Sequence, residues 1–374
     1  MSDTDARDGE HMRAALALAR RGLGSVWPNP SVGCVLVQDG RVVGRGVTAP
    51  GGRPHAETIA LASAGAQARG ATAYVTLEPC SHHGRTPPCA EALAAAGVAR
   101  VVVACSDPDP RVDGAGIALL RAAGLEVVAG TLATEARLLQ AGFLTRVGLG
   151  RPMVTLKLAS TLDGRIATRT GESQWITGPA ARRAAHALRG QHDAVLAGVG
   201  TVQADNPELT CRIPGYRRTP DLRIVVDSHL RAGLTARVVS TAATVPTWFL
   251  HRSGADADRM LALNEAGVRL IEVAGAEHGI DLAAGMQALG AAGLTRVLVE
   301  GGAQIAGALL RARLVDRVAW FHAPSVMGGD GWPAAQAFGT TALDGMPRFQ
   351  RVGSREVGDD MLTEFSRREA GRAA

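Results

Sequence analysis

One histidine, one glutamate and two cysteines in the first quarter of the chain are spaced as in a catalytic zinc site. His55 and Glu57 belong to the segment Pro54-His55-Ala56-Glu57, and eight residues separate Cys80 from Cys89. One imidazole and two thiolates suit tetrahedral Zn²⁺ and leave a fourth position for water, whose pKa the metal lowers. Glu57 is placed to carry protons during hydrolysis. Apart from the longer cysteine spacing, the pattern follows the signature of zinc deaminases.

A structural zinc site is the alternative interpretation of the same residues. His82 or His83 would then supply a fourth protein ligand and close the coordination sphere. Five cysteines in 374 residues are too few for a disulfide framework. Cys34 and Cys105 lie in apolar, strand-like stretches, so we expect them to be buried core thiols.

Glycine-rich turns in the second half indicate a site for an anion or a nucleotide. The segment 297–303 passes from an apolar run through Gly301-Gly302 into a helical pattern, which exposes backbone N–H groups to an anion. The usual G-x-G-x-x-G dinucleotide fingerprint is absent, so a plain turn is the alternative, also for Gly198-Val199-Gly200-Thr201. Trp175 is equally compatible with a core aromatic, and the arginines at 182, 183 and 189 with a solvated helix face.

Apolar strand-like runs alternate with helical stretches along the whole chain, which predicts an α/β protein with mainly parallel sheets. Gly148-Leu149-Gly150-Arg151-Pro152 interrupts the pattern and predicts two domains, 1–147 and 148–374. In the first domain we expect a hairpin of 32–37 with 42–47, strands at 73–77, 101–104 and 125–128, and helices at 10–21, 55–64, 89–96, 116–123 and 134–144. In the second we expect strands at 153–158, 194–197, 222–226, 247–250, 269–273, 296–299 and 315–322, and helices at 178–188, 259–265, 282–289 and 304–310.

Composition excludes several classes of protein. Hydrophobic residues make up 46% and charged residues 20%, which is too apolar for intrinsic disorder. No apolar run approaches the roughly 18 residues of a membrane span, and the polar start is no signal peptide, so we expect a soluble cytoplasmic protein. Aromatics at 3% argue against a base-stacking nucleic-acid binder, while a net charge of +5 permits an anionic ligand.

The two constellations together resemble the RibD family of bifunctional riboflavin biosynthesis enzymes. In the first half, the resemblance rests on Pro28-Asn29-Pro30-Ser31-Val32-Gly33, on residues 54–57 and on 78–89 with their Gly-Arg-Thr-Pro-Pro-Cys insertion. In the second half, it rests on 157–165, 171–177, 198–201, 205–212 and 297–303. The resemblance implies an N-terminal cytidine-deaminase-like α/β/α domain and a C-terminal dihydrofolate-reductase-like α/β domain that uses NADPH.

The resemblance also implies roles for individual residues. The zinc ligands are His55, Cys80 and Cys89, with Glu57 as proton carrier; Asn29, His82 and Arg85 contact the first substrate. The NADPH site comprises Ala159, Trp175, Thr201, Asp205, Ser228, Gly302, Ala303, Gln304, Ile305, Ala306, Gly307 and Ala308. Ser173, Arg189, Leu209, Arg212 and Glu300 contact the second substrate. Lys157, the only lysine of the chain, and Asp205 are the candidates for polarising or protonating the reacting sugar.

We therefore expect two successive reactions on a small phosphorylated pyrimidine: zinc-dependent deamination and NADPH-dependent reduction of the ribosyl group. The resemblance further implies a homo-oligomer, with neither nucleic acid nor a membrane as partner. Three alternatives remain: a nucleic-acid base deaminase with an accessory nucleotide-binding domain, an enzyme with a single active half, and a non-catalytic zinc-stabilised binding module. Residues 229–290 carry no recognisable motif.

Overall fold

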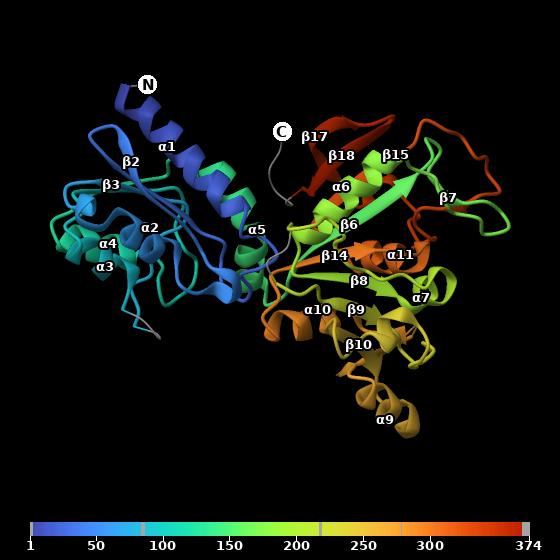
Figure 1. Cartoon of the computed structure of the whole chain (residues 1–374). Helices are drawn as coiled ribbons and strands as arrows, with labels where there is room; N and C mark the ends of the chain where they lie inside the picture. The colour runs from blue at the N-terminus through green and yellow to red at the C-terminus, as the bar shows by residue number, and fades with distance from the viewer. Residues whose placement is uncertain (1–2, 84–86, 217–218, 278, 369–374) are drawn as a thin grey trace. The chain divides into compact units, whose positions relative to one another are not determined.

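The computed structural model describes residues 3–83, 87–216, 219–277 and 279–368. Contacts along the backbone divide the chain into two compact units, Met1–Gly150 and Arg151–Ala374. Each unit is built around its own sheet and is coloured separately along the chain in Figure 1, blue to teal for the first and green to red for the second. Within the described residues, no helix combines the length and apolar character needed to cross a membrane.

The first unit holds a five-stranded sheet of order β2-β1-β3-β4-β5. β1 pairs antiparallel with β2 and β3, and β3, β4 and β5 run parallel. Its strands are β1 (Gly33–Gln38), β2 (Arg41–Val47), β3 (Thr72–Val75), β4 (Arg100–Val103) and β5 (Glu126–Ala129). Its α-helices are α1 (Asp3–Arg20), α2 (Ala56–Ala64), α3 (Cys89–Ala95), α4 (Ala115–Ala122) and α5 (Ala133–Leu149).

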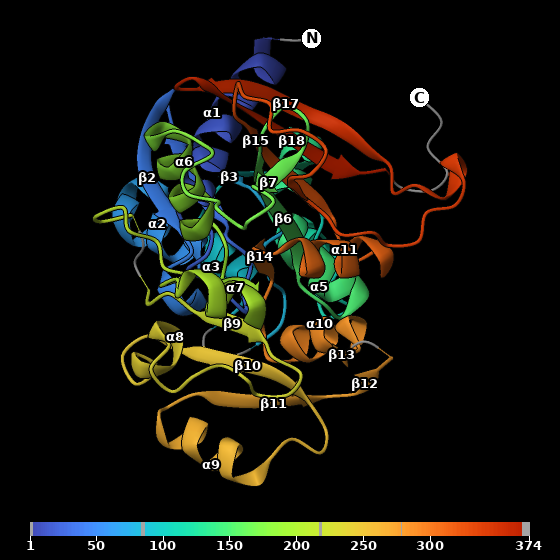
Figure 2. The ribbon, with the colours of Figure 1, turned by 90° about the vertical axis from the view of Figure 1, so that its right-hand side faces the viewer.

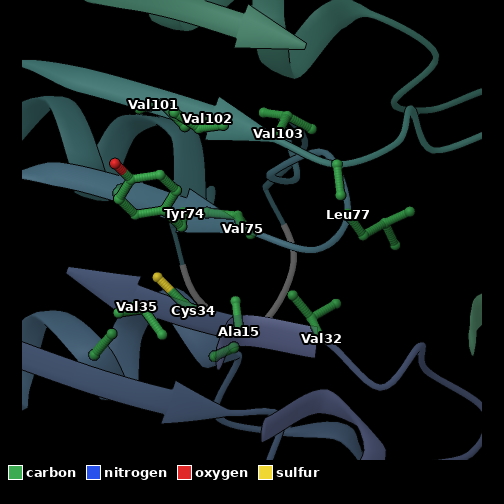
Figure 3. Close-up of a cluster of buried hydrophobic side chains, with 14 of the residues drawn as sticks. Ala15, Val32, Cys34, Val35, Tyr74, Val75, Leu77, Val101, Val102 and Val103 are labelled. Atoms are coloured by element: carbon green, nitrogen blue, oxygen red, sulfur yellow. The ribbon is translucent and has the colours of Figure 1, made fainter. Parts of the chain in front are cut away.

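The central strands of this sheet are short and apolar. They are buried because helices cover both faces of the sheet. Val101, Val102 and Val103 of β4 are all fully buried, as a continuous apolar run in a parallel strand predicts. Figure 3 shows them beside Val75 of β3 and Cys34 of β1. Cys34 and Cys105 are both buried free thiols, which confirms the expectation for them.

The second unit holds a nine-stranded sheet of order β11-β10-β9-β8-β14-β6-β15-β18-β17, in which only β18 and β17 run antiparallel to their neighbours. Its strands are β6 (Met153–Ser160), β8 (Ala194–Gly198), β9 (Arg223–Val226), β10 (Thr247–Arg252), β11 (Arg269–Val273), β14 (Arg296–Glu300), β15 (Arg317–His322), β17 (Phe349–Val357) and β18 (Asp360–Arg367). Two small ribbons accompany it, β7 (Arg165–Ala167) with β16 (Trp332–Pro333) and β12 (Gly275–Ala276) with β13 (Gly279–Ile280).

Helices cover the two faces of this sheet in separate groups, which Figures 1 and 2 let the reader follow. Leu298 of β14 and Phe321 of β15 pack against α6, whereas Gly198 of β8 lies against Ile305 of α11. Leu250 of β10 lies on the same face as α11, against Gly285 of α10. The helices are α6 (Pro179–Gly190), α7 (Val199–Asp205), α8 (Arg237–Ser240), α9 (Ala257–Glu265), α10 (Leu282–Ala291) and α11 (Ala303–Arg311).

The structure lengthens several expected elements and adds others, namely α7, α8, the short strands β7, β12, β13 and β16, and the β17–β18 hairpin. α1 begins at Asp3 because Asp5 and Asp8 lie near its positive end, where acidic residues stabilise a helix. α5 continues to Leu149, beyond the expected end of the helix. The β17–β18 hairpin lies where the sequence predicts no element, because β17 is exposed along most of its length and lacks an apolar alternation. Pairing with β18 stabilises β17 as a strand, although the residues of β17 carry no strand pattern.

Candidate active sites

The three expected zinc ligands converge in the first unit. The Nδ1 atom of His55 lies 3.3 Å from Sγ of Cys89 and 3.7 Å from Sγ of Cys80. Tetrahedral zinc with usual Zn–N and Zn–S bond lengths holds such atoms about 3.5 Å apart. His55 precedes α2, and Cys89 is the first residue of α3, so two helix starts and the loop after β3 carry the ligands. The donor set and its spacing therefore fit a zinc ion.

The ligand set is open on one side. Among the described residues, the group of potential metal ligands comprises His55, Cys80 and Cys89 alone. His83 faces Glu91 at 3.5 Å, and Nδ1 of His82 is buried without a hydrogen-bond partner in the described part of the chain. Neither histidine closes the group, and three protein ligands with a free position are typical of catalytic zinc.

Within this group, the hydrogen bonds between neighbouring ligands shift the pKa values of the two thiols in opposite directions. Hydrogen bonds from Cys89 and from His55 lower the pKa of Cys80 to about 4. The hydrogen bond with Cys80, together with burial, raises the pKa of Cys89 far above its ordinary value. Only one of the two sulfurs therefore carries negative charge readily without a cation, and a divalent metal would remove that conflict because it deprotonates coordinating thiols outright.

Glu57 lies in the first turn of α2 and is almost fully buried. Burial raises the pKa of its carboxyl to about 7, since desolvation disfavours the charged form. A carboxyl that titrates near neutrality can both accept and return a proton, which is what a general acid–base residue requires.

A cavity of about 310 Å³ adjoins the ligand set and contains Asn29, His55, Glu57, Cys80 and His82 in its lining. Arg85 lies outside the described residues, so its predicted contact has no structural account. The lining also includes charged residues that the sequence analysis missed: Arg53, Asp107, Asp109, Arg111 and Arg146. The run Asp107-Pro108-Asp109-Pro110, directly after a buried strand, is the sequence signal that marks this part of the wall.

Two carboxyls of this wall titrate differently because only one has a cationic partner. Burial raises the pKa of Asp107 to about 6. The Arg111 guanidinium, 2.5 Å from Asp109, lowers the pKa of Asp109 to about 2. Glu78 fixes the backbone of this wall, because its carboxylate accepts hydrogen bonds from the backbone N–H groups of Asp107, Gly114 and Ile117.

In the second unit, a glycine pair connects β14 to α11 as expected. Gly301 and Gly302 both have positive φ, 126° and 44°, and a Cβ on Gly301 would lie 2.7 Å from Oγ1 of Thr201. The first turn bond of α11 runs from Ala306 N to Gly302 O, so the amides of Ala303, Gln304 and Ile305 point outward from the helix start.

A backbone that allows close approach and presents outward N–H groups has the features that suit an anion. Gly307 and Ala308 lie in the second turn, where Gly307 packs against the backbone of Gln336. Only the start of the predicted stretch 302–308 thus lies at the beginning of the helix.

A buried charge cluster forms where the last residue of β14 pairs with the middle of β6. Arg189 of α6 donates from Nε and Nη2 to the Glu300 carboxylate at 2.6 and 2.8 Å, and from Nη1 to the Thr210 carbonyl at 2.8 Å. Lys157 is paired with Glu300 in the strand register. The pKa of Glu300 falls to about 2 because Arg189 and Lys157 outweigh its burial, while burial lowers the pKa of Lys157.

A second cavity, of about 440 Å³, is lined by Thr161, Ser173 and Trp175, together with Glu172, Gln174 and Met327, which the sequence analysis missed. The Trp175 ring is 67% exposed and lies 4.6 Å from the Arg182 guanidinium, so it is a surface aromatic rather than a core one. Ala159 lies on β6, two residues beyond Lys157 on the same face of the sheet.

The remaining expected residues lie at strand and helix ends of this unit. Leu209 is buried, and Arg212 is half-exposed with Nη1 bonded to Glu208 at 3.0 Å. Asp205 ends α7, and partial burial raises its pKa. Ser228 follows β9, beside Gly279 of β13.

Comparisons with known proteins give matches to both units. Residues 152–363 match the family described as the RibD C-terminal domain, and residues 5–105 match the cytidine and deoxycytidylate deaminase zinc-binding region. The riboflavin biosynthesis protein RibD of Escherichia coli (strain K12) is 43% identical over 366 residues, which cover 95% of this chain and 98% of that protein. The structure of Acinetobacter baumannii RibD (form 2) is 37% identical with a TM-score of 0.86, covering 98% of this chain and 100% of that one.

A Thermotoga maritima structure matches almost as fully. It is described as a diaminohydroxyphosphoribosylaminopyrimidine deaminase/5-amino-6-(5-phosphoribosylamino)uracil reductase, and it is 34% identical with a TM-score of 0.85, covering 97% of this chain and 99% of that one. The expected two-domain α/β fold and the expected cofactors, zinc and NADPH, are confirmed. The chain belongs to the RibD family, whose members are bifunctional deaminase–reductases of riboflavin biosynthesis.

Proposed function

We propose that the first unit deaminates 2,5-diamino-6-(5-phosphoribosylamino)pyrimidin-4(3H)-one and that the second reduces the product, 5-amino-6-(5-phosphoribosylamino)uracil, to its ribityl derivative. The observation that carries this proposal is the open His55–Cys80–Cys89 group beside a buried Glu57 and a cavity. The description of the Thermotoga maritima protein supports the choice of substrates.

In the first reaction, Glu57 moves protons while the neighbouring residues hold the pyrimidine. Zinc supplies the Lewis acidity that makes water nucleophilic near neutral pH. With a pKa of about 7, the Glu57 carboxylate accepts a proton from water and passes it to the ring nitrogen, and it then carries the second proton of that water to the departing amine. Asn29 and His82 face the same cavity and are assigned to substrate binding, as is Arg85.

In the second reaction, the residues of the unit chiefly position two reactants. NADPH supplies the hydride that reduces C1′ of the ribosyl group. We assign Ala159, Trp175, Thr201, Asp205, Ser228 and the stretch 302–308 to the cofactor, and Ser173, Leu209, Arg212, Arg189 and Glu300 to the substrate. Lys157, which faces Glu300, and Asp205 are the candidate proton donors to the sugar. Because all three donor groups of Arg189 have protein acceptors, the half-exposed Arg212 is the better placed cation for the substrate phosphate.

We further assign the deaminase to residues 1–147 and the reductase to 148–374, in keeping with the division of contacts after Gly150. The substrate is taken to be a small molecule, with neither nucleic acid nor a membrane as partner, because the description of the Thermotoga maritima protein names phosphoribosylaminopyrimidine compounds. A cytoplasmic location suits the two thiol ligands, which must stay reduced. A homo-oligomer is proposed from the family resemblance alone.

Mass analysis of products, first without and then with NADPH, tests the proposal. Replacement of one amino group by oxygen without NADPH, followed by a gain of two hydrogens with it, supports both steps in that order. If only the first change occurs, the reductase assignment fails. If zinc-loaded protein changes nothing, the substrate assignment fails, and deamination of single-stranded RNA or DNA becomes the next assay.

A further inference from the structure

The loop of residues 206–216 carries two of the residues assigned to the second substrate, Leu209 and Arg212. Asn206 and Leu209 have positive φ, 42° and 53°, and the Leu209 side chain is buried in the apolar core of this unit. A leucine rarely adopts positive φ, and such a backbone persists only where surrounding contacts hold it. The shape of this loop therefore depends on the elements that contact it.

Helix α6 holds the loop through polar side chains near its C-terminal end. The Thr210 carbonyl accepts a hydrogen bond from Nη1 of Arg189 at 2.8 Å and lies 3.1 Å from Nδ1 of His186. One turn further along, Nε2 of Gln191 donates to the Tyr216 hydroxyl at 2.9 Å. Among these side chains, His186 is the one that the functions proposed above do not use.

The half-buried imidazole of His186 contacts Arg212 at two places. The backbone N–H of Arg212 lies 3.1 Å from Nδ1, and Nη2 of its guanidinium lies 3.4 Å from Nε2. A neutral imidazole has one donor and one acceptor nitrogen. With the proton on Nδ1, the ring donates to the Thr210 carbonyl and accepts from the guanidinium. With the proton on Nε2, Nδ1 accepts from the backbone N–H, so both neutral tautomers connect His186 to Arg212.

The surroundings of His186 favour the neutral ring that these contacts require. Burial lowers the pKa of His186, and the guanidinium groups of Arg189 and Arg212 lower it further, against the opposing effect of the Glu300 carboxylate. An imidazolium has donors only and would not accept a hydrogen bond from Arg212. His186 therefore acts on Arg212 through geometry and adds no positive charge of its own.

The Arg212 guanidinium is held from two sides. Nη1 donates to the Glu208 carboxylate at 3.0 Å, and Nη2 faces His186. These two contacts leave N–H groups of the half-exposed guanidinium for a further acceptor. A long side chain that is ordered before the ligand arrives loses less conformational entropy on binding.

We propose that His186 is a positioning residue, which holds the Arg212 guanidinium in the orientation that binds the phosphate of the second substrate. This inference rests on the reductase function proposed above, in which Arg212 takes that phosphate. His186 itself does not touch the phosphate, because its ring nitrogens face the loop. It should therefore raise the affinity for the phosphorylated ligand and leave the hydride step unchanged.

Calorimetric titration of the full zinc-loaded chain tests this role without relying on turnover. The ligands are the reduction product, 5-amino-6-(5-phosphoribitylamino)uracil, and the same compound without its phosphate, and the ratio of their affinities measures the contribution of the phosphate. Arg212→Gln should lower this ratio about tenfold or more, because a charge-assisted contact is lost. His186→Leu should lower it about three- to tenfold, and His186→Gln should recover part of the loss, because an amide retains a donor and an acceptor.

Two further measurements separate positioning of Arg212 from general support of the loop. His186→Leu should cause no further loss in the Arg212→Gln background, since its effect passes through Arg212. With saturating phosphorylated substrate, His186→Leu should keep the wild-type kcat, with the loss confined to KM. Gln191→Leu removes another hydrogen bond from α6 to the same loop and is the matched control, which should leave the ratio unchanged.

The outcomes separate this inference from the function on which it rests. If Arg212→Gln lowers the ratio but His186→Leu does not, or if the two losses add in the double variant, the inference is wrong while the reductase function remains. If His186→Leu weakens both ligands alike, His186 supports the loop in general, and the inference is again wrong. If Arg212→Gln leaves the ratio unchanged, the inference falls with the phosphate assignment of Arg212. If the wild-type chain binds neither ligand, the proposed reductase function and the inference fail together. Equal melting temperatures of the variants and the wild type exclude misfolding as the cause of any loss.

Discussion

The two sites handle buried charge in opposite ways. Beside the zinc ligands, Glu57 and Asp107 are buried carboxyls whose pKa values are raised, to about 7 and about 6. In the second unit, Glu300 is equally buried, but Arg189 and Lys157 lower its pKa to about 2. The first site therefore keeps carboxyls that can exchange protons at neutral pH, and the second keeps a charge that is fixed.

This difference matches what each proposed reaction requires. Hydrolytic deamination transfers several protons between water, ring and amine, so a carboxyl near neutrality is useful. Hydride transfer depends on holding two reactants in line, so a fixed ion pair that anchors α6 to β14 is useful instead. In these two sites, the direction of the buried carboxyl's pKa shift therefore follows the presence of a cationic partner, and it agrees with the role proposed for each group.

Glu57→Gln is expected to have the largest effect. Removing the proton carrier should slow deamination by about 10²–10⁴-fold. Zinc content should stay at the wild-type level, because His55, Cys80 and Cys89 remain. Ammonia release and metal analysis measure the two quantities, with Glu91→Gln, a half-exposed carboxyl on α3, as control.

If Glu57→Gln also slows the reduction of preformed 5-amino-6-(5-phosphoribosylamino)uracil, the assignment of proton exchange to the first site alone is wrong. Unchanged ammonia release with zinc bound would show that Glu57 is not the proton carrier. A non-catalytic zinc module would instead release no ammonia in either protein, and Glu57→Gln would leave its ligand binding unchanged.

Lys157→Met should lower the reductase rate and leave deamination unchanged. If Lys157 donates a proton to the sugar, the loss in kcat should be about 100-fold. NADPH should still bind, since the glycine turn and α11 are untouched. Single-turnover absorbance of NADPH measures the step. A loss confined to KM would show that Lys157 acts only in binding. Arg183→Gln, at an exposed position of α6, controls for charge.

Much of the fold is predictable from the sequence because most strands and helices carry their own pattern. β11 has the expected bounds, and α10 begins at the expected residue, since apolar periodicity and an aspartate cap at Asp281 mark it. The β17–β18 hairpin is not predictable from its own residues, because tertiary pairing rather than local preference creates it.

The two candidate sites also differ in how far the sequence alone predicts them. The zinc ligands come from two short segments with a strict signature, so the sequence alone brings them together. The ion pair of Arg189 with Glu300 joins residues 111 positions apart, and nothing in either local segment signals the partner. Arg146 is not predictable as a site residue because a residue of the cavity wall needs only to face the cavity and follows no spacing rule.

Gly301→Ala should have a smaller effect, on cofactor binding alone. Its φ of 126° disfavours any side chain, and the new Cβ would press on Oγ1 of Thr201. A strain of about 1–3 kcal/mol should weaken NADPH binding roughly tenfold or more. Gly200→Ala is the matched control, because nothing lies within 4 Å of the added carbon there. Equal NADPH affinities of the two variants in a fluorescence titration would show that the turn does not approach the cofactor.

Asp107→Asn gives the smallest effect and tests the raised pKa directly. The folded protein holds the Asp107 proton more tightly than the unfolded chain, because the pKa rises from 3.8 to about 6. The stability that this proton provides is present below pH 3.8 and is lost as the pH rises through about 6. Asparagine does not titrate, so the variant should gain about 1–3 kcal/mol over the wild type between acidic and neutral pH.

Urea unfolding of both proteins across that pH range measures the difference, with Asp39→Asn in the exposed turn between β1 and β2 as control. A pH-independent difference would mean that folding leaves the pKa of Asp107 at its ordinary value, so that its carboxyl is ionised at neutral pH. The first site would then contain one proton-exchanging carboxyl, Glu57, rather than two, and the wall of its cavity would act as a fixed anion toward the substrate.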